Sequence, residues 1–435
     1  CKPKERIDEP VCGPGSGMII KPEVLERAIE LCEQKNGRGY KIFFSPQGIK
    51  LTQRVLKNLN NANAHEPPQF LPPSFSQKKL NIQTKNKKSL EHIILVCPRY
   101  EGMDARVEKH YADALFSIGD YILMGGDLPA QVFIESFLRL VPGVVGKQES
   151  VEKESFSNHL LDYPQFGLPI EWQGQKIPEI VLSGNHKAIE QWRQEEACKK
   201  TLLDRFDWFR EHTLSYSPLV PSDLQSKSYR GITSCQKQIP PHYVALMHTD
   251  IILKVGKEGD TRVGHTSVTS LDLHDTARSC ATYGIKNMFM VSPLKDQLVI
   301  MNDLLSFWKS DQGKKYNFSR FEAVSRVLPT TSLAETIDFI TNKEGKKPLV
   351  VTTSAKTHEH AEGIDYFSQG KVWRHDRPVL FVFGTGQGLC DKIIDQSDFL
   401  LVPVEGMTGY KHLSVRSAVA IILDRWLGLQ PKINS

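Results

Sequence analysis

Residues 93–104 decide the fold of the first half, and they read Ile-Ile-Leu-Val-Cys-Pro-Arg-Tyr-Glu-Gly-Met-Asp. The apolar, β-branched start predicts a buried strand over 92–97, and the Pro and Gly after it predict a loop. On either side, short apolar runs alternate with segments whose apolar residues recur at helical spacing. We predict strands over 41–45 and 120–123, and helices over 24–34 and 129–141. Such alternation is typical of an α/β fold with a mostly parallel sheet and flanking helices.

The second half repeats this plan. A predicted strand over 379–383 leads into Gly384-Thr385-Gly386-Gln387-Gly388, then a helix, a strand over 399–404 and an apolar helix over 413–427. Further strands are predicted over 242–247, 287–291 and 348–352. Ligands of open parallel sheets bind outside the carboxyl ends of the strands, where glycines let the backbone approach them closely. Each half therefore carries a candidate ligand site at its glycine-bearing loops.

Between the halves the periodicity weakens. Residues 163–240 contain several prolines and one charged helical piece over 187–212. Residues 60–88, rich in Asn, Pro, Lys and Gln, are expected to form a long surface insertion. We expect a first domain over 1–165, a linker and residual helical region over 166–239, and a second domain over 240–435.

Bulk composition sets wider bounds. The 435 residues can bury more than one core, and the net charge of +5 permits a polyanionic partner such as RNA. The eight cysteines include no Cys-x-x-Cys pair and suggest no disulfide framework, which favours a reducing cytoplasm. No apolar run approaches the roughly 20 residues needed to span a bilayer. Because a Gly-rich turn follows Cys1 so soon, we expect a further segment before it.

Two motifs have alternative interpretations. The run Gly384–Gly388 could belong to a dinucleotide-binding oxidoreductase, but that fingerprint lies in the first βα unit, and a purely structural turn is also open. His358-Glu359-His360 could chelate a metal ion, although solvated side chains in a polar loop are the simpler interpretation. No Walker A sequence supports an NTPase.

Six motifs of the first half, in order over about 8–193, resemble those of the bacterial tRNA (guanine-N1) methyltransferase family TrmD, of the SPOUT class. They are Ser45–Gly48, Leu95–Asp104, Ser117–Leu123, Gly125–Ala130, Val141–Val144 and Leu182–His186. The resemblance implies a sheet with a C-terminal trefoil knot, binding of S-adenosylmethionine, and methylation of N1 of the guanosine immediately 3′ of the anticodon. It also implies a homodimer whose active site forms between two subunits, and it allows Mg²⁺ as an additional cofactor.

The resemblance assigns the cofactor to loop residues of the first half. These are Ser45, Pro46, Pro98, Tyr100, Glu101, Gly102, Ser117, Ile118, Gly119, Tyr121, Leu123, Gly125, Gly126 and Pro129.

Two further residues match the family's catalytic positions. A sulfonium is already a good methyl donor, so catalysis mainly requires in-line positioning and removal of the guanine N1 proton. By the resemblance, Glu154 stands where the family has an aspartate base, and Arg139 is the cation that offsets charge on the base. Without the resemblance, Glu154 is an ordinary surface charge and Arg139 an exposed helical residue.

The second half resembles the SPOUT methyltransferase domain that is fused behind TrmD in some bacteria. The resemblance rests on residues 383–389, 400–404 and 410–418, with Lys411 where that family usually has Asn. It implies a second knot and a second S-adenosylmethionine site on backbone and side chains of Phe383, Gly384, Thr385, Gly386, Leu401, Val402, Pro403, Val404, Leu413 and Ser414.

We therefore expect a cytoplasmic, dimeric enzyme with two S-adenosylmethionine sites, acting on tRNA and on a second RNA target. Two alternatives remain at this point. Pro98 in place of glycine, together with Glu154, suits a catalytically weakened cofactor- and RNA-binding protein, whereas an NAD-dependent oxidoreductase would bind nicotinamide instead.

Overall fold

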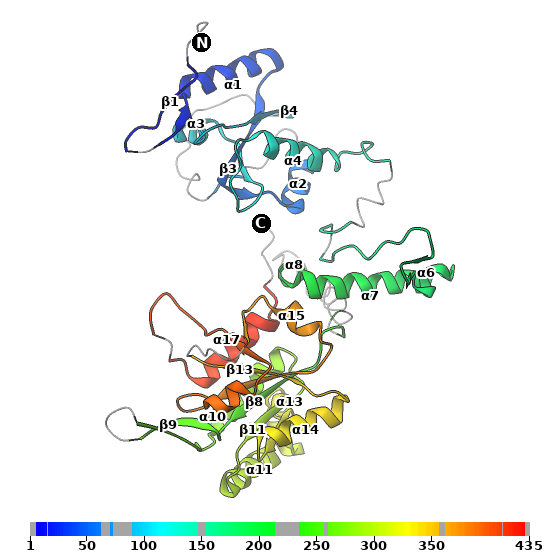
Figure 1. Ribbon diagram of the computed structural model, residues 1–435, viewed down its shortest axis with the longest axis vertical. Helices are drawn as coiled ribbons and strands as arrows, with labels where there is room; N and C mark the ends of the chain where they lie inside the picture. The colour runs from blue at the N-terminus through cyan, green and yellow to red at the C-terminus, as the bar shows by residue number, and fades with distance from the viewer. Residues whose placement is uncertain are drawn as a thin grey trace. The chain divides into compact units, whose positions relative to one another are not determined.

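The computed structural model describes residues 6–14, 16–61, 70–72, 89–146, 154–157, 159–213, 235, 237–255, 260–355, 362–410 and 412–430. The chain divides into two compact units, Cys1–Ser157 and Asn158–Ser435, which are labelled by element in Figure 1. Each unit has its own parallel sheet covered by helices, so the predicted α/β class is confirmed.

The first unit is built on a three-stranded parallel sheet in the order β4-β3-β5. Alternate residues of the central strand enter two cores, with Ile42 on one face and Phe43 on the other, as the period of two in a strand requires. The elements of this unit are β1 (Asp8–Pro10), β2 (Met18–Ile20), α1 (Pro22–Asn36), β3 (Gly39–Lys50), α2 (Gln53–Asn60), β4 (Ser89–Val96), α3 (Ala105–Tyr111), β5 (Ala114–Ser117) and α4 (Asp127–Leu138).

The prediction of a strand over 120–123 is wrong, because these residues form no strand. The third strand of the sheet is β5, which lies several residues earlier and is buried along its whole length. Tyr121 and Ile122 are instead 56% and 80% exposed. Both segments are short apolar runs, and only the pairing of Leu115 with Phe43 of β3 decides between them.

The predicted surface insertion over 60–88 is wrong at Phe70. The Phe70 amide donates to the Asp113 carbonyl (3.2 Å) and its carbonyl accepts from the Leu115 amide (2.9 Å), so it extends the sheet beside β5. Its ring centroid lies 5.7 Å from that of Phe116. The insertion therefore contributes at least one core side chain; residues 62–69 and 73–88 lie outside the described part.

The second unit contains a seven-stranded parallel sheet in the order β12-β11-β8-β15-β13-β16-β14. The strands predicted over 242–247, 287–291, 348–352, 379–383 and 399–404 correspond to five of these. The elements of this sheet and its connections are β8 (His242–Met247), β9 (Ile251–Val255), β10 (Asp260–Gly264), α10 (Ser270–Thr282), β11 (Met288–Val291), α11 (Lys295–Lys309), α12 (Asp311–Tyr316), α13 (Phe318–Val324), β12 (Val327–Thr330), α14 (Leu333–Glu344), β13 (Leu349–Thr353), β14 (Gly363–Ile364), α15 (Gln369–Trp373), β15 (Val379–Gly384), α16 (Asp391–Asp395), β16 (Phe399–Leu401) and α17 (Val415–Leu427).

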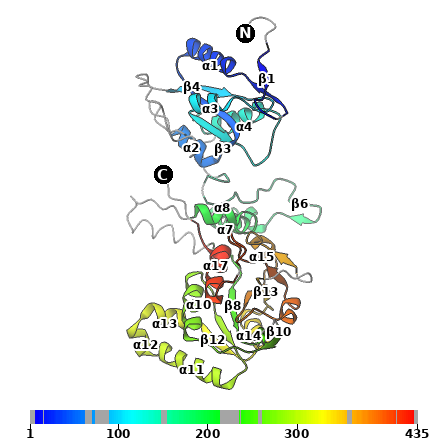
Figure 2. The same ribbon diagram turned by 90° about the vertical axis from the view of Figure 1, so that its left-hand side faces the viewer.

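Two cores cover the faces of this sheet. Residues of α10, α11, α13 and α17 pack on Val244 and Leu246 of β8. Residues of α14 and α16 pack on Tyr243 and Ala245, which point to the opposite face. Figure 2 shows α10 to α13 beside one another, separate from α14. β9 and β10 form a separate antiparallel hairpin.

The helical piece predicted over 187–212 is two helices, α7 (His186–Asp204) and α8 (Phe206–His212), interrupted at Arg205. They follow β6 (Glu171–Trp172), β7 (Gln175–Lys176) and α6 (Glu179–Leu182). Arg210 of α8 is buried and its guanidinium donates to the carbonyls of Asp424, Arg425 and Gly428 after and within α17. Helices α7 and α8 therefore pack within the second unit. The sequence analysis expected a linker and residual helical region here.

The cysteine pattern predicted no disulfide framework. This prediction is wrong for one pair, because a disulfide joins Cys198 to Cys235 across 37 residues. Packing of α7 brings the two together, which spacing alone does not reveal. Within the described ranges, no helix is long and apolar enough to cross a lipid bilayer.

Candidate functional site

The carboxyl ends of the first sheet meet at one edge. Phe43 of β3 pairs with Val96, the last residue of β4, and Phe44 pairs with Phe116 near the end of β5, so β3 reaches this edge at residues 43–44. The segments that follow them hold most of the residues expected to bind the cofactor. The register of parallel strands, rather than proximity in sequence, brings these segments together.

The first segment is a bulge at residues 45–48. The β3–β5 register shifts between Phe44 and Ile49, which pair in turn with the same residue of β5. A Cβ on Gly48 would lie 2.5 Å from the Phe116 carbonyl carbon, so only glycine fits there. The bulge leaves Ser45 half-buried and Pro46 exposed at this edge.

The second segment follows β4 and the third follows β5, and these two segments touch each other directly. The Gly126 amide donates to the Pro98 carbonyl (2.7 Å), and Arg99 forms a bridge with Gly125 and an ion pair with Asp127 (2.7 Å). A Cβ on Gly126 would stand 2.5 Å from Pro98 Cδ and 2.7 Å from the Cys97 Cα. The glycine therefore permits this close approach of two backbone segments, with Pro129 buried in the first turn of α4.

Aromatic side chains stand exposed at the same loops. Tyr100 has a positive φ of 60° and is 61% exposed, and Tyr121 is 56% exposed with its hydroxyl near the Ile118 carbonyl. Ser117 is buried, and its hydroxyl donates to the Gly119 carbonyl (3.1 Å). The hydrogen-bonded turn at Ser117 and the exposed rings of Tyr100 and Tyr121 are suited to contact a planar base.

The proposed catalytic residues Arg139 and Glu154 form an ion pair of 2.5 Å, in which each side chain is about two-fifths exposed (43% and 41%). Helix α2 supports the chain next to each member of this pair. Lys57 donates to the Ser157 carbonyl (3.2 Å), near Glu154, and Asn60 donates to the Leu140 carbonyl (3.3 Å), next to Arg139. The pair lies at the end of α4, whereas the cofactor loops lie at its start. Twelve residues separate these ends, which is about 18 Å at 1.5 Å per residue.

The glycine run of the second unit is anchored to two neighbouring strands. The Thr385 amide and hydroxyl both donate to the Met247 carbonyl. The Ile252 carbonyl accepts from the Gln387 amide (3.0 Å), and the Ile252 amide donates to the Gly388 carbonyl (2.8 Å). Gly386 has a φ of 59°, and a Cβ there would approach the Ile252 carbonyl oxygen to 3.2 Å. The loop is therefore a rigid turn at the carboxyl end of β15.

A chain of polar side chains, which the sequence did not predict, runs from this loop to β8. Thr385 donates to a carbonyl, so it accepts from Thr266 (2.6 Å), and Thr266 in turn accepts from Nδ1 of His248 (3.1 Å). His248 is fully buried; burial lowers the pKa of its imidazole, while Asp272 and the Ser267 carbonyl raise it. The only sequence signal is that His248 directly follows a strand.

The segment after β16 is held by the edge strand. The Val402 amide donates to the Ile364 carbonyl (2.9 Å), and the Tyr366 hydroxyl donates to the Val402 carbonyl (3.1 Å). Leu401 is buried, whereas Pro403 and Val404 are half-buried. Their backbone is thus presented at the same edge as the glycine run.

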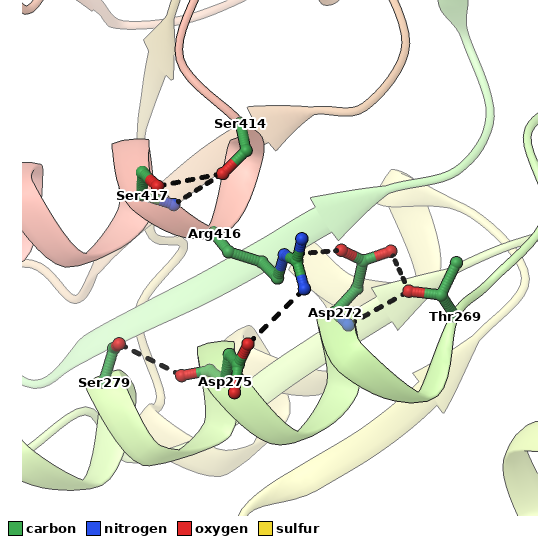
Figure 3. A network of polar contacts seen from close by, with 7 residues as sticks. All are labelled: Thr269, Asp272, Asp275, Ser279, Ser414, Arg416 and Ser417. Atoms are coloured by element: carbon green, nitrogen blue, oxygen red, sulfur yellow. Dashed lines mark hydrogen bonds and ion pairs between the residues drawn. The ribbon is translucent and has the colours of Figure 1, made fainter.

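The last helix begins at this edge and is tied to α10, as Figure 3 shows. Ser414 caps α17 by accepting from the Ser417 amide (3.3 Å), next to the exposed Leu413. Arg416 forms ion pairs with Asp272 (3.6 Å) and Asp275 (3.5 Å) on the first turns of α10. The sequence did not predict this connection, because its partners lie more than a hundred residues apart.

The remaining candidates lie elsewhere. Among the described residues no three His, Cys, Asp or Glu side chains gather as a metal site. His358-Glu359-His360 and Lys411 lie outside the described part.

Taken together, two parallel sheets flanked by helices, each with glycine-bearing loops at its carboxyl edge, define an α/β protein with two candidate ligand-binding edges. Residues 71–211 match the family model of the tRNA (guanine-1)-methyltransferase TrmD, and residues 241–428 match that of a SAM-dependent RNA methyltransferase. The tRNA (guanine-N(1)-)-methyltransferase of Nitratidesulfovibrio vulgaris is 35% identical over 422 residues, covering 97% of this chain and 88% of its own length. That of Oleidesulfovibrio alaskensis is 32% identical over the same shares.

Shorter relatives match the first half alone, as for the tRNA (guanine-N(1)-)-methyltransferase of Dictyoglomus turgidum, 37% identical over 49% of this chain and 74% of its own. The chain belongs to the tRNA (guanine-N(1)-)-methyltransferase family.

Proposed function

We propose that the first domain transfers a methyl group from S-adenosylmethionine to N1 of the guanosine immediately 3′ of the tRNA anticodon, and that the second domain methylates an RNA at a separate site. The observation that carries this proposal is the similarity of 97% of the chain to a tRNA (guanine-N(1)-)-methyltransferase. The comparisons give no support to a catalytically weakened binding protein or to an oxidoreductase.

The boundaries 1–165, 166–239 and 240–435 are proposed as functional divisions. The match to the first family continues through α7 and α8, although these helices pack with the second unit. We place the protein in the cytoplasm, where its tRNA substrate is.

The residues at both edges fit the methyl donor. When bound, S-adenosylmethionine supplies an activated methyl group on sulfur. Glycine at positions 126 and 386 lets each of these loops pack closely on neighbouring backbone, which fixes the loop conformation beside the proposed donor site. Among the described residues no three His, Cys, Asp or Glu side chains gather, and no proposed step depends on Mg²⁺.

The ion pair of Arg139 and Glu154 supports a division of labour at the acceptor base. A carboxylate at Glu154 can take the guanine N1 proton, which makes N1 nucleophilic. A guanidinium at Arg139 can then stabilise the negative charge that spreads to O6. Pairing in the free protein holds both side chains in place until the base enters between them.

We further propose that the active site is completed by a second copy. The length of α4 separates the cofactor loops from the catalytic pair within one chain. Apolar side chains stand exposed along and before this helix, namely Ile122 (80%), Met124 (90%), Leu128 (58%), Val132 (47%), Ile134 (44%) and Leu138 (44%). Exposed apolar side chains in this number are typical of a subunit interface.

A methyl-transfer assay tests the activity. Purified chain with labelled S-adenosylmethionine should methylate a tRNA transcript carrying guanosine 3′ of its anticodon, and nucleoside mapping should give N1-methylguanosine. A matched transcript with adenosine at that position is the control. Equal labelling of both transcripts, or a different modified nucleoside, would refute the proposal.

Mixing two inactive variants tests the shared site. Glu154→Gln removes the base and Gly126→Ala weakens cofactor binding, so each homodimer should have little activity at a cofactor concentration well below the dissociation constant of the Gly126→Ala variant. Co-refolded mixtures should regain up to about a quarter of wild-type activity, because half of the chains form mixed dimers with one intact site. No recovery in a mixture shown by mass spectrometry to contain mixed dimers would exclude the shared site.

We propose a trefoil knot at the end of each sheet. In the second unit this is supported by the position of β16 between β13 and β14, which are consecutive strands of the chain. The proposal for the first unit rests on the family. A crystal structure in which residues 402–414 pass outside the segment that joins β13 to β14 would contradict it.

A further inference from the structure

We propose that the surface formed by α11, α12 and α13 binds an unpaired stretch of RNA, which rests on the proposed RNA methylation by the second domain. Three aromatic side chains stand exposed there: Phe307 (47%), Tyr316 (76%) and Phe318 (59%). We call these three residues the aromatic platform. Every base has a flat π-face, so exposed rings bind single strands by stacking with little dependence on sequence.

The backbone beneath the platform is fixed. Tyr316 ends α12 and Phe318 begins α13, and Asn317 between them caps α13 by accepting from the Arg320 amide (2.9 Å). A Cβ on Gly313 would lie 2.5 Å from the Phe307 carbonyl oxygen, so α11 and α12 meet in close contact. Little ordering is therefore needed on binding, which favours affinity.

Cations accompany the rings. The Arg320 guanidinium lies 5.0 Å from the Trp308 ring centroid, and the Lys314 ammonium 5.6 Å from that of Phe321. Lys315 is exposed, and within the described part of the chain Arg320 forms no ion pair with a carboxylate. Residues 309–322 hold four basic and two acidic side chains. Cations beside rings suit the phosphates and bases of one RNA strand.

The platform is connected to the proposed methyl-donor site through α10. The Trp308 ring packs edge-on against His274 of α10 at 5.2 Å. Nδ1 of His274 is buried and has no hydrogen-bond partner among the described residues. The neighbouring Asp272 and Asp275 hold Arg416, at the start of α17. These helices share one face of the sheet, so an RNA strand on the platform would lie along the helices that lead to that site.

Binding of a fluorescent, unstructured RNA oligonucleotide to the full chain tests this inference. The double variant Tyr316→Ala/Phe318→Ala should weaken binding about tenfold or more, the effect of losing one or two stacked bases. Tyr316→Phe should retain binding because it keeps the ring. Phe367→Ala removes an equally exposed ring (80%) elsewhere on the unit and should have no effect.

Salt dependence supplies a second measurement. Lys314→Gln/Lys315→Gln should reduce the slope of log affinity against log salt by about 1.4, the value for two phosphate contacts on a single strand. This variant leaves the rings in place, so it also tests the surface if the aromatic double variant does not fold. An unchanged slope would overturn the proposal for the cations.

The outcomes separate this inference from the proposed function. If both sets of variants leave oligonucleotide affinity unchanged while the second domain still methylates RNA, the platform is refuted and the activity stands. If Tyr316→Ala/Phe318→Ala instead abolishes self-association in sedimentation velocity without changing RNA affinity, the surface is a protein interface and the inference is wrong. Methylation of tRNA by the first domain should be unchanged in every variant.

Discussion

At the residue scale, Arg139 and Glu154 show how far residue identity can carry a functional hypothesis. Their pairing across 15 positions is a contact between the end of a helix and a later turn. Neither residue has a feature in composition or periodicity that distinguishes it from a surface charge. The family resemblance selected them, and the structure adds that they contact each other.

The Glu154→Gln substitution tests the proposed base. The amide keeps the shape of the side chain but cannot accept the guanine N1 proton, so methyl transfer to tRNA should fall by a factor of about 10² to 10⁴. Affinity for S-adenosylmethionine, measured by calorimetry, should stay within twofold of wild type. Activity close to wild type would show that another group removes the proton.

At the element scale, close contacts between loops decide where ligand-binding backbone is available. Gly126→Ala places a methyl group within 2.7 Å of the Cys97 Cα, so two segments must move apart. Overpacking of this kind costs about 1–3 kcal/mol, and we expect at least a tenfold loss of S-adenosylmethionine affinity in the first domain.

Gly146→Ala is the matched control for that substitution. No atom lies within 4 Å of a Cβ built there, and its φ is not positive. Equal effects of the two substitutions on calorimetric binding would mean that the contact between the 97–102 and 125–127 segments does not shape the site.

The connection between α10 and α17 supports a second prediction at this scale. Arg416→Ala removes two ion pairs whose arginine side chain is 33% exposed, and should weaken S-adenosylmethionine binding to the second domain about fivefold by loosening the start of α17. Arg416→Lys should restore part of the affinity. Arg278→Ala, on an exposed part of α10, should leave binding unchanged. A loss of stability without a loss of affinity would identify Arg416 as purely structural.

At the scale of the whole molecule, we expect His242 to make the stability of the second unit depend on pH. Its Nδ1 lies 2.7 Å from the Pro240 carbonyl, and its Nε2 accepts from the indoles of Trp373 and Trp426 (3.2 Å each). Burial lowers the pKa of this imidazole to about 4, partly opposed by the hydrogen bond to Pro240. The neutral ring therefore joins β8, α15 and α17.

The sign of the resulting pH dependence is determined by the lowered pKa. The unfolded imidazole binds a proton below pH 6.5 and the folded one only below about 4, so stability is complete above 6.5 and declines as pH falls between these values. The full loss is about 3 kcal/mol. Urea unfolding of wild type at pH 7 and pH 5 should differ more than that of His242→Gln. An equal difference in both proteins would refute the role of His242.

Much of the fold could be predicted from the sequence because the signals were local. The apolar run at Val379 and the helical spacing around Ile422 identify buried elements without knowledge of their partners. The prediction failed where two short apolar runs, residues 114–117 and 120–123, were both possible strands. Only pairing with β3 shows that residues 114–117 form the strand. The prediction also failed at Phe70, whose polar neighbours concealed a core residue.

The candidate sites divide in the same way. The sequence by itself determined the α/β class, the two glycine-bearing edges and the family, because these depend on periodicity and on ordered motifs along the chain. Only the tertiary structure decided that α7 and α8 pack on the second unit, that His248 connects through Thr266 to Thr385, and that Arg416 holds α10. These contacts join residues far apart in the chain, and their energies depend on three-dimensional distances that no local pattern specifies.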